Sequence, residues 1–124
     1  MLVRASLATL VMLAACSSNS DTPNTPDAGP PTVMEVTCPA TPAASIAADD
    51  NTDVFMPSTV SVNVGQIVKF TMPSTHNVVP DPPKATDAGL MVGFSATTCL
   101  MFTKAGTFNF KCGIHGFEGA VTVQ

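Results

Sequence analysis

The chain has few basic side chains. Its 124 residues contain five lysines and arginines against nine aspartates and glutamates, which gives a formal net charge of −4 at pH 7. Proteins that bind nucleic acids need clustered lysine or arginine to neutralise phosphates, so a nucleic-acid partner is excluded. A basic protein surface is the more suitable partner for an acidic chain.

The chain also lacks an apolar run at its N-terminus long enough to cross a bilayer, which needs about 20 residues. A shorter run, Ser6 to Ala15, follows the single charge of Arg4. A charged start, an apolar stretch and then small residues are typical of a secretory signal peptide. We therefore expect residues 1–15 to direct export and to be removed afterwards.

The end of this segment, Leu13-Ala14-Ala15-Cys16, resembles the bacterial lipobox, in which the cysteine is lipidated and becomes the first mature residue. The alternative is an ordinary signal peptide in which Cys16 has no special role. Residues 17–32 favour the lipoprotein, because they hold no aliphatic side chain larger than alanine and several prolines, and cannot bury enough apolar surface to become ordered. We expect residues 16–32 to form a disordered tether that anchors an exported protein to a bacterial membrane, facing the periplasm or the cell surface.

Helical periodicity is missing from the remaining residues, 33–124, which are enough for one small domain. No window repeats apolar residues at helical spacing for more than one turn. Apolar and polar residues alternate instead in short segments separated by proline and glycine, which is typical of strands. The fold class expected is therefore all-β, as an antiparallel β-sandwich.

The alternation is clearest in two pairs of segments. Residues 60–64 and 67–72 flank a turn at Gly65-Gln66, which predicts a hairpin. Residues 100–103 and 107–112 flank a second turn, and their period of two places Phe108, Phe110 and Cys112 on one side of a sheet. Cys112 is thus expected to point inward at the end of a strand. Further strands are expected at 33–38 and 121–123, and a surface loop or irregular crossover at 80–93.

Histidine is scarce as well, because the chain has only His76 and His115. Cys112 precedes His115 by three residues. Gly113 lies between them and Gly116 follows His115, and both allow a tight turn because glycine has no side chain to clash. One thiolate and two imidazoles form the ligand set of single copper ions that cycle between Cu(I) and Cu(II). A closed zinc site needs four protein ligands, and only three strong candidates are present. We therefore expect one copper ion at His76, Cys112 and His115.

Four cysteines in an exported chain raise the question of disulfides. If Cys16 carries lipid, three pairings of the remaining cysteines are open. Assigning Cys112 to the metal leaves Cys38 to pair with Cys99. Such a bridge would close a long loop and contribute about 2–4 kcal/mol to stability.

These segments together resemble the plastocyanin-like cupredoxins, the small blue copper proteins. The resemblance spans nearly the whole domain and implies a Greek-key sandwich whose metal ligands map onto His76, Cys112 and His115. It also implies that Asn77 hydrogen-bonds toward the loop of the thiolate. The matching segments are Phe55-Met56-Pro57, the alternating run 60–70, His76-Asn77-Val78-Val79, the run from Phe102 through Gly106-Thr107-Phe108 to His115, and Gly119-Ala120-Val121-Thr122-Val123.

One element departs from the family pattern. Related proteins usually carry an axial methionine, a weak fourth ligand, a few residues after the second histidine, but here His115 is followed by Gly116-Phe117-Glu118. Three outcomes are open. Glu118 could supply an oxygen ligand, the ring of Phe117 could cover the axial face, or Met91 or Met101 could reach the site from elsewhere.

The resemblance implies electron transfer. The protein would shuttle one electron between larger redox proteins at the cell envelope, with His115 as the port and a transient redox partner such as a cytochrome. A copper carrier or storage module is the alternative. An enzyme is not expected, because a second copper centre needs further histidines. We expect a monomer, and the acidic group Asp49, Asp50 and Asp53 is more simply a solvated loop than a docking site.

Overall fold

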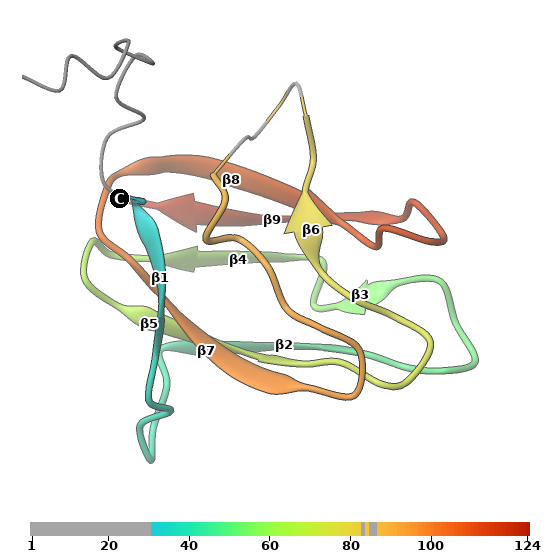
Figure 1. Ribbon diagram of the computed structural model, residues 1–124. Coiled ribbons are helices and arrows are strands. Elements are labelled where there is room, and N and C mark those ends of the chain that lie inside the picture. Colours follow the sequence, from blue (N-terminus) through green and yellow to red (C-terminus); the bar gives the residue numbers. More distant parts are fainter. Residues whose placement is uncertain (1–30, 83, 85–86) are drawn as a thin grey trace, which may run out of the picture.

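The computed structural model describes residues 31–82, 84 and 87–124, which form two packed β-sheets (Figure 1). One sheet has the strand order β1-β7-β5-β2-β3 and the other β4-β9-β8-β6. No helix in the described part of the chain is long and apolar enough to cross a membrane. The strands are β1 (Val33–Val36), β2 (Ala44–Ala48), β3 (Phe55–Met56), β4 (Thr59–Val62), β5 (Ile67–Thr71), β6 (Val79–Pro80), β7 (Thr97–Phe102), β8 (Gly106–Lys111) and β9 (Glu118–Val123).

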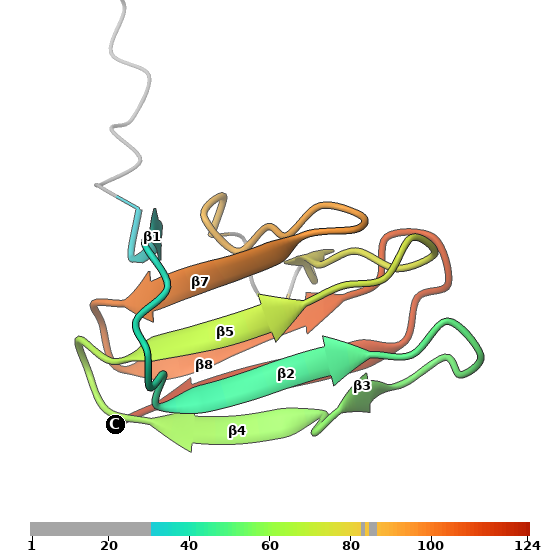
Figure 2. The same ribbon diagram turned by 90° about the horizontal axis from the view of Figure 1, so that it is seen from below.

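The all-β sandwich is confirmed, but its strand pairing is mixed and not wholly antiparallel. The pairs β2–β5 and β4–β9 run parallel, while the other pairs run antiparallel. Figure 2 shows β2 and β5 side by side with their arrows in the same direction. An alternating sequence identifies a strand and its buried face, but it does not determine which strand lies next to it.

The hairpin predicted around Gly65 is wrong. Strand β4 belongs to the four-stranded sheet and β5 to the five-stranded sheet, so the turn carries the chain from one layer to the other. Gly65 adopts a φ of 85°, which favours glycine, and its N–H donates to the carbonyl of Phe102 at 2.7 Å. Val62 and Val68 are both buried, but from opposite sheets across one core, an arrangement with the same sequence pattern as a hairpin.

The core between the sheets is aromatic. The ring of Phe110 in β8 lies 4.8 Å from that of Phe55 and 5.5 Å from that of Phe70, measured between centroids. Phe108, Phe110 and Cys112 are buried in turn along β8 and just beyond it. The inward orientation expected for Cys112 is therefore confirmed, and it results from the two-residue period of the strand.

The disulfide expected between Cys38 and Cys99 is present, with an S–S distance of 2.08 Å. It joins the segment after β1 to β7, which also pair through the ladder from Val33 to Val36. Cys112 is a free cysteine and is buried. The Cys38–Cys99 pairing, expected once Cys112 is assigned to the metal, is therefore the one observed.

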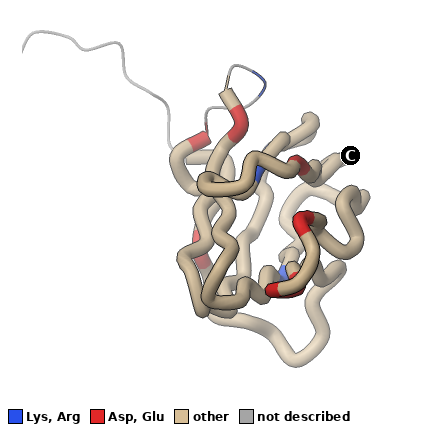
Figure 3. Tube along the Cα trace, turned by 90° about the vertical axis from the view of Figure 1, so that its right-hand side faces the viewer, with Lys and Arg blue, Asp and Glu red and all other residues tan. Residues whose placement is uncertain are grey.

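The loops of the sandwich gather at one end, on the right in Figure 1, and Figure 3 looks onto that end. The loop after β2 contacts the loop after β5, where the hydroxyl of Thr75 donates to the Asp50 carboxylate at 2.6 Å. The segment before β7 joins them, since the N–H of Ser95 donates to the carbonyl of Pro73 at 3.0 Å. We call this end the loop end; the loop after β8 also belongs to it.

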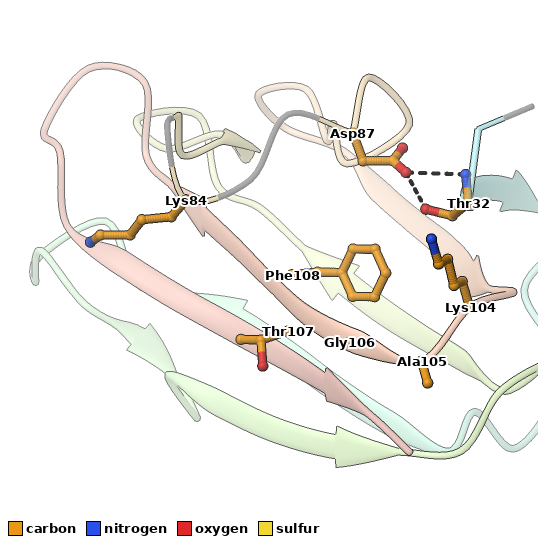
Figure 4. A pocket seen from close by; sticks show the side chains of 8 residues that line it. All are labelled: Thr32, Lys84, Asp87, Lys104, Ala105, Gly106, Thr107 and Phe108. Atoms are coloured by element: carbon orange, nitrogen blue, oxygen red, sulfur yellow. Dashed lines mark hydrogen bonds between the residues drawn. The ribbon is translucent and has the colours of Figure 1, made fainter. Parts of the chain in front are cut away.

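The described chain begins at the opposite end. Thr32 donates from its backbone N–H to the Asp87 carboxylate at 3.1 Å and also from its hydroxyl (Figure 4). Its carbonyl accepts from the N–H of Thr103 at 2.9 Å. Thr32, the last residue of the expected tether, is therefore fixed to the domain. The expected signal peptide, Cys16 and the rest of the tether up to residue 30 lie outside the described residues.

The segment 80–93 is irregular, as expected. In its described part it contains only the end of β6 and an isolated bridge between Val78 and Val92. Asp81 is buried to 6% exposure there, and Lys84 lies 3.3 Å from its carboxylate. The segment nevertheless contributes Leu90 and Val92 to the core, and its Asp87 bonds to Thr32 just before β1.

Candidate metal centre

Three donor atoms converge at the loop end. His76 lies in the loop after β5, Cys112 directly follows β8, and His115 follows Cys112 within the same loop. The Nδ1 atoms of the two histidines are 3.1 Å apart, and Cys112 Sγ lies 3.7 Å from His76 Nδ1 and 3.8 Å from His115 Nδ1. Among the described residues these three form the one His, Cys, Asp and Glu cluster suited to a metal ion. The structure thus brings together all three predicted ligands.

The spacing of the donors fits one ion. Bonds of about 2.0 Å to nitrogen and about 2.3 Å to sulfur, in a trigonal plane, would place the donors about 3.5–3.7 Å apart. The observed separations of 3.1–3.8 Å bracket these values. A soft thiolate with two imidazoles is the donor chemistry that copper prefers in both oxidation states. The cluster therefore fits a single copper ion.

A backbone carbonyl fixes the orientation of His76. The Nε2 atom lies 3.0 Å from the carbonyl oxygen of Asp49, which can only accept a hydrogen bond. In the neutral imidazole the proton therefore sits on Nε2, and the lone pair of Nδ1 faces Cys112 and His115. The side chain of His76 is buried to 1% exposure, so this bond also satisfies its second nitrogen.

Asn77 connects the two ligand loops, as the resemblance implied. Its Oδ1 accepts a hydrogen bond from the N–H of Gly113 at 2.7 Å and lies 3.7 Å from Cys112 Sγ. A side chain at position 113 would meet the amide of Asn77, because a Cβ built there lies 3.2 Å from Oδ1. Glycine at 113 therefore allows the bond that positions the segment after Cys112.

The ligand loop closes in a tight turn. The N–H of Gly116 donates to the carbonyl of Cys112 at 2.9 Å, and Gly116 has a φ of 76°, a left-handed conformation that favours glycine. The N–H of Cys112 donates to the carbonyl of Phe117 at 3.0 Å. These two bonds fold residues 112–117 back on themselves and bring His115 beside the thiol that precedes it.

The surroundings of Cys112 favour the thiolate. Burial alone would raise the pKa of the thiol, but backbone N–H groups of His115, Asn77 and Ile114, together with the imidazole of His76, outweigh it and lower the pKa to about 6. Burial would likewise lower the pKa of His76, but its contacts with Cys112 and with the Asp49 carbonyl raise it. The thiolate is the form that binds metal.

The candidates for a fourth ligand lie elsewhere. Glu118 is 56% exposed, and its carboxylate accepts from Lys84 Nζ at 2.8 Å, so the structure does not bring it to the cluster. Met91 is 58% exposed. Met101 pairs with Ile67 and Met34 toward the end of the sandwich opposite the loop end. Phe117, by contrast, lies against the cluster, with its ring centroid 4.9 Å from that of His76.

The geometry also shows contacts that the sequence did not identify. The Asp49 carbonyl gave no signal, because any residue has a backbone oxygen. The carboxylate of Asp53 lies 3.9 Å from His115 Nδ1, close enough for a coulombic interaction with that imidazole when it is charged. A loop rich in aspartate predicts solvent exposure, and only the fold shows which ligand it faces.

Solved structures provide the comparison. No protein-family model and no curated protein matches the chain. A proline-to-phenylalanine variant of amicyanin matches with a TM-score of 0.53 and 25% identity over 66% of this chain and 82% of that one. A tryptophan-to-tyrosine variant gives 0.59 and 22% over 75% and 99%, and amicyanin from Paracoccus versutus gives 0.58 and 18% over 75% and 98%. The domain has the cupredoxin fold.

The cupredoxin fold explains where the three ligand residues lie and how exposed each one is. The rigid sandwich ends at β5 and β8, and the loops that follow these strands carry His76 and Cys112. His115 has a side chain that is 37% exposed, and the neighbouring Ile114 is 66% exposed. The buried thiol and imidazole hold the centre, and the exposed imidazole connects it to the surface.

Proposed function

We propose that this protein is a one-copper electron carrier of the bacterial cell envelope. The observation that carries the proposal is the convergence of Cys112 Sγ and two Nδ1 atoms within 3.8 Å of one another. The cupredoxin fold supports it, since solved amicyanin structures with this fold include a Cu(I) form. A bound copper ion would supply the one-electron step between Cu(I) and Cu(II).

The residues of the chain hold the ligands in place before any metal enters. The Asp49 carbonyl orients His76, and Asn77 ties the loop of Cys112 through Gly113. Ligands held by hydrogen bonds to a rigid sandwich move little when the charge at the centre changes. Such a site suits fast electron transfer, because little structural rearrangement accompanies the change of oxidation state.

The partner would dock over His115. Ile114, next to His115 in the chain, is 66% exposed and provides an apolar surface beside the exposed imidazole. Phe94, in the segment before β7, is 44% exposed and adds to the apolar surface of the loop end. Acidic positions lie on loops that face the viewer in Figure 3, and Asp53 is 66% exposed beside His115. We propose a transient contact with a redox protein whose docking face is apolar at its centre and basic at its rim.

A copper carrier without a redox role is the second candidate, because both functions need a tight thiolate site. Voltammetry and chelator competition on the copper-loaded protein distinguish them. The electron carrier requires a reversible one-electron wave and retention of copper against a Cu(I) chelator. Ready transfer of Cu(I) to the chelator, or a wave that is absent or irreversible, would favour the carrier of copper.

A catalytic role is not part of the proposal. Both histidines of the chain take part in the one cluster, so none is left for a second copper centre.

We also propose that the protein acts as a monomer. Sedimentation of the copper-loaded protein tests this, and a dimer at micromolar concentration would contradict it.

For location, we propose a lipid anchor at Cys16. The first described residues lie at the end of β8 opposite Cys112, and a six-residue strand spans about 20 Å. A tether leaving from there would hold the loop end away from the membrane, free to meet a partner. Labelling with a radioactive fatty acid tests the anchor, and equal labelling of wild type and Cys16→Ser would contradict it.

A further inference from the structure

The metal centre has no fourth donor among the described histidine, cysteine, aspartate and glutamate side chains. Among the described residues of these four types, only His76, Cys112 and His115 gather closely enough to share one ion. Glu118 is engaged by Lys84 at 2.8 Å. The two methionines considered from the sequence are, respectively, exposed and at the far end of β7. Of the three outcomes left open by the sequence, the one that remains for the side of the ligand triangle toward the core is the ring of Phe117.

Phe117 occupies that position. Its ring meets the His76 ring edge-on, with centroids 4.9 Å apart and planes at 88°. It lies nearly parallel to the His115 ring, at 17° and 6.5 Å between centroids. The ring of Phe55 backs it from the core at 4.5 Å. Phe117 thus contacts both imidazoles on one side and the buried aromatic core on the other.

The backbone keeps this ring in register with the thiolate. The carbonyl of Phe117 accepts from the N–H of Cys112 at 3.0 Å, so the residue that supplies the sulfur also positions the ring. Phe117 is half-buried and packs against the hydrophobic core. Its position is therefore fixed by the same turn that brings His115 to Cys112.

We propose that Phe117 closes the core side of the ligand triangle, so that the bound copper has three protein donors and no fourth. The proposal rests on the proposed function and adds how its redox balance is set. Cu(I) favours soft donors and low coordination number, whereas Cu(II) gains more from an additional donor. An aromatic ring excludes both a protein donor and water from that side. Phe117 is a positioning residue that raises the affinity for Cu(I) relative to Cu(II).

Two variants separate the role of the ring from mere packing. Phe117→Met brings a thioether to the same place, and Phe117→Leu keeps an apolar side chain with no donor. We expect Phe117→Met to change the ratio of Cu(II) to Cu(I) affinity about tenfold in favour of Cu(II), which lowers the midpoint potential by about 59 mV for a one-electron couple. We expect Phe117→Leu to change it by less than a third of that. Only Phe117→Met should alter the visible spectrum.

A second measurement on the unchanged protein covers the case in which a variant does not fold. X-ray absorption at the copper edge of the loaded wild type should give two nitrogen donors and one sulfur donor, in both oxidation states. A fourth nearby donor in either oxidation state, or equal potentials and spectra for Phe117→Met and wild type, would overturn the proposal. Loss of the thiolate spectrum in the wild type itself would instead contradict the proposed function, and this inference with it.

Discussion

At the scale of single residues, Asn77 has the clearest separable role. Its Oδ1 accepts from the Gly113 N–H at 2.7 Å and stands 3.7 Å from the sulfur of Cys112. It therefore joins the loop that carries one histidine to the loop that carries the thiolate. An amide at this place can hold the loop without adding charge to the metal centre.

Substitution of Asn77 should separate these two effects. Asn77→Ala removes the acceptor for Gly113, and we expect a loss of about 1 kcal/mol in unfolding free energy, measured by denaturant titration. Asn77→Asp keeps an acceptor oxygen and should retain most of that stability. Its negative charge near the sulfur should favour Cu(II) and lower the midpoint potential. Equal stability of Asn77→Ala and wild type would contradict a structural role for the bond.

The sequence predicted the three ligands because their residue types are chemically specific. A free thiol and the only two histidines leave few other combinations, and the strand register gives the direction of Cys112. The role of Phe117 could not be decided in the same way. A phenylalanine has no donor atom, so nothing in its identity separates a core position from the cover of a metal site.

At the scale of elements, the residue at which β9 begins determines which way the side chain of Glu118 points. Strand β9 (Glu118–Val123) buries Gly119, Val121 and Val123, so the two-residue period sends Glu118 to the outer face. There Glu118 pairs with Lys111 across the ladder and bonds to Lys84. The sequence suggested a strand only from 121, which left Glu118 free in a loop and made it a candidate ligand.

Glu118→Gln should therefore leave the copper centre unchanged. The side chain is 56% exposed and its partner Lys84 is 52% exposed, and exposed ion pairs contribute only about 0–1 kcal/mol. We expect the same visible spectrum and midpoint potential as wild type, with at most a small loss in unfolding free energy. A shifted potential or band would show that the carboxylate reaches the copper in the loaded protein.

The elements missed by the sequence analysis are the short or weakly apolar ones. Strand β2 is built largely from alanine, and β3 and β6 each have two residues, so none shows a clear alternation. The predicted hairpin at Gly65 failed for a different reason. Strands β4 and β5 each carry a correct alternating pattern, but the pattern contains no information on which layer a strand joins.

At the scale of the whole molecule, the disulfide stabilises a small domain. The bond between Cys38 and Cys99 spans a sequence separation of 61 residues and joins the edge strand β1 to β7. A cross-link over a loop of this length restricts the unfolded chain strongly. Because none of the metal ligands takes part in it, its removal should affect stability and not the chemistry of the site.

We expect the double substitution Cys38→Ala, Cys99→Ala to lower the unfolding free energy by about 2–5 kcal/mol. Denaturant titration of the copper-free protein gives this value. The copper-loaded variant should keep the wild-type visible spectrum when measured well below its unfolding temperature. A lost copper band in a variant that is still folded would mean that the bridge also holds the ligand loops.

The donor cluster and the N-terminal end of the described chain lie at opposite ends of the sandwich. The loop end carries the donor cluster and the exposed side chains beside His115, and the opposite end holds Thr32, near the start of the described chain. The single domain, its all-β class and the three candidate metal ligands could be predicted from the sequence. The separation of the two ends could not, because it depends on how the strands are distributed between the sheets.

The most direct test of the central claim is the visible absorption of the Cu(II)-loaded protein beside that of Cys112→Ser. Direct bonding of the Cys112 sulfur to copper predicts intense charge-transfer absorption in the wild type and its loss in the serine variant. A colourless wild type saturated with Cu(II), or an equally intense band in Cys112→Ser, would contradict the account.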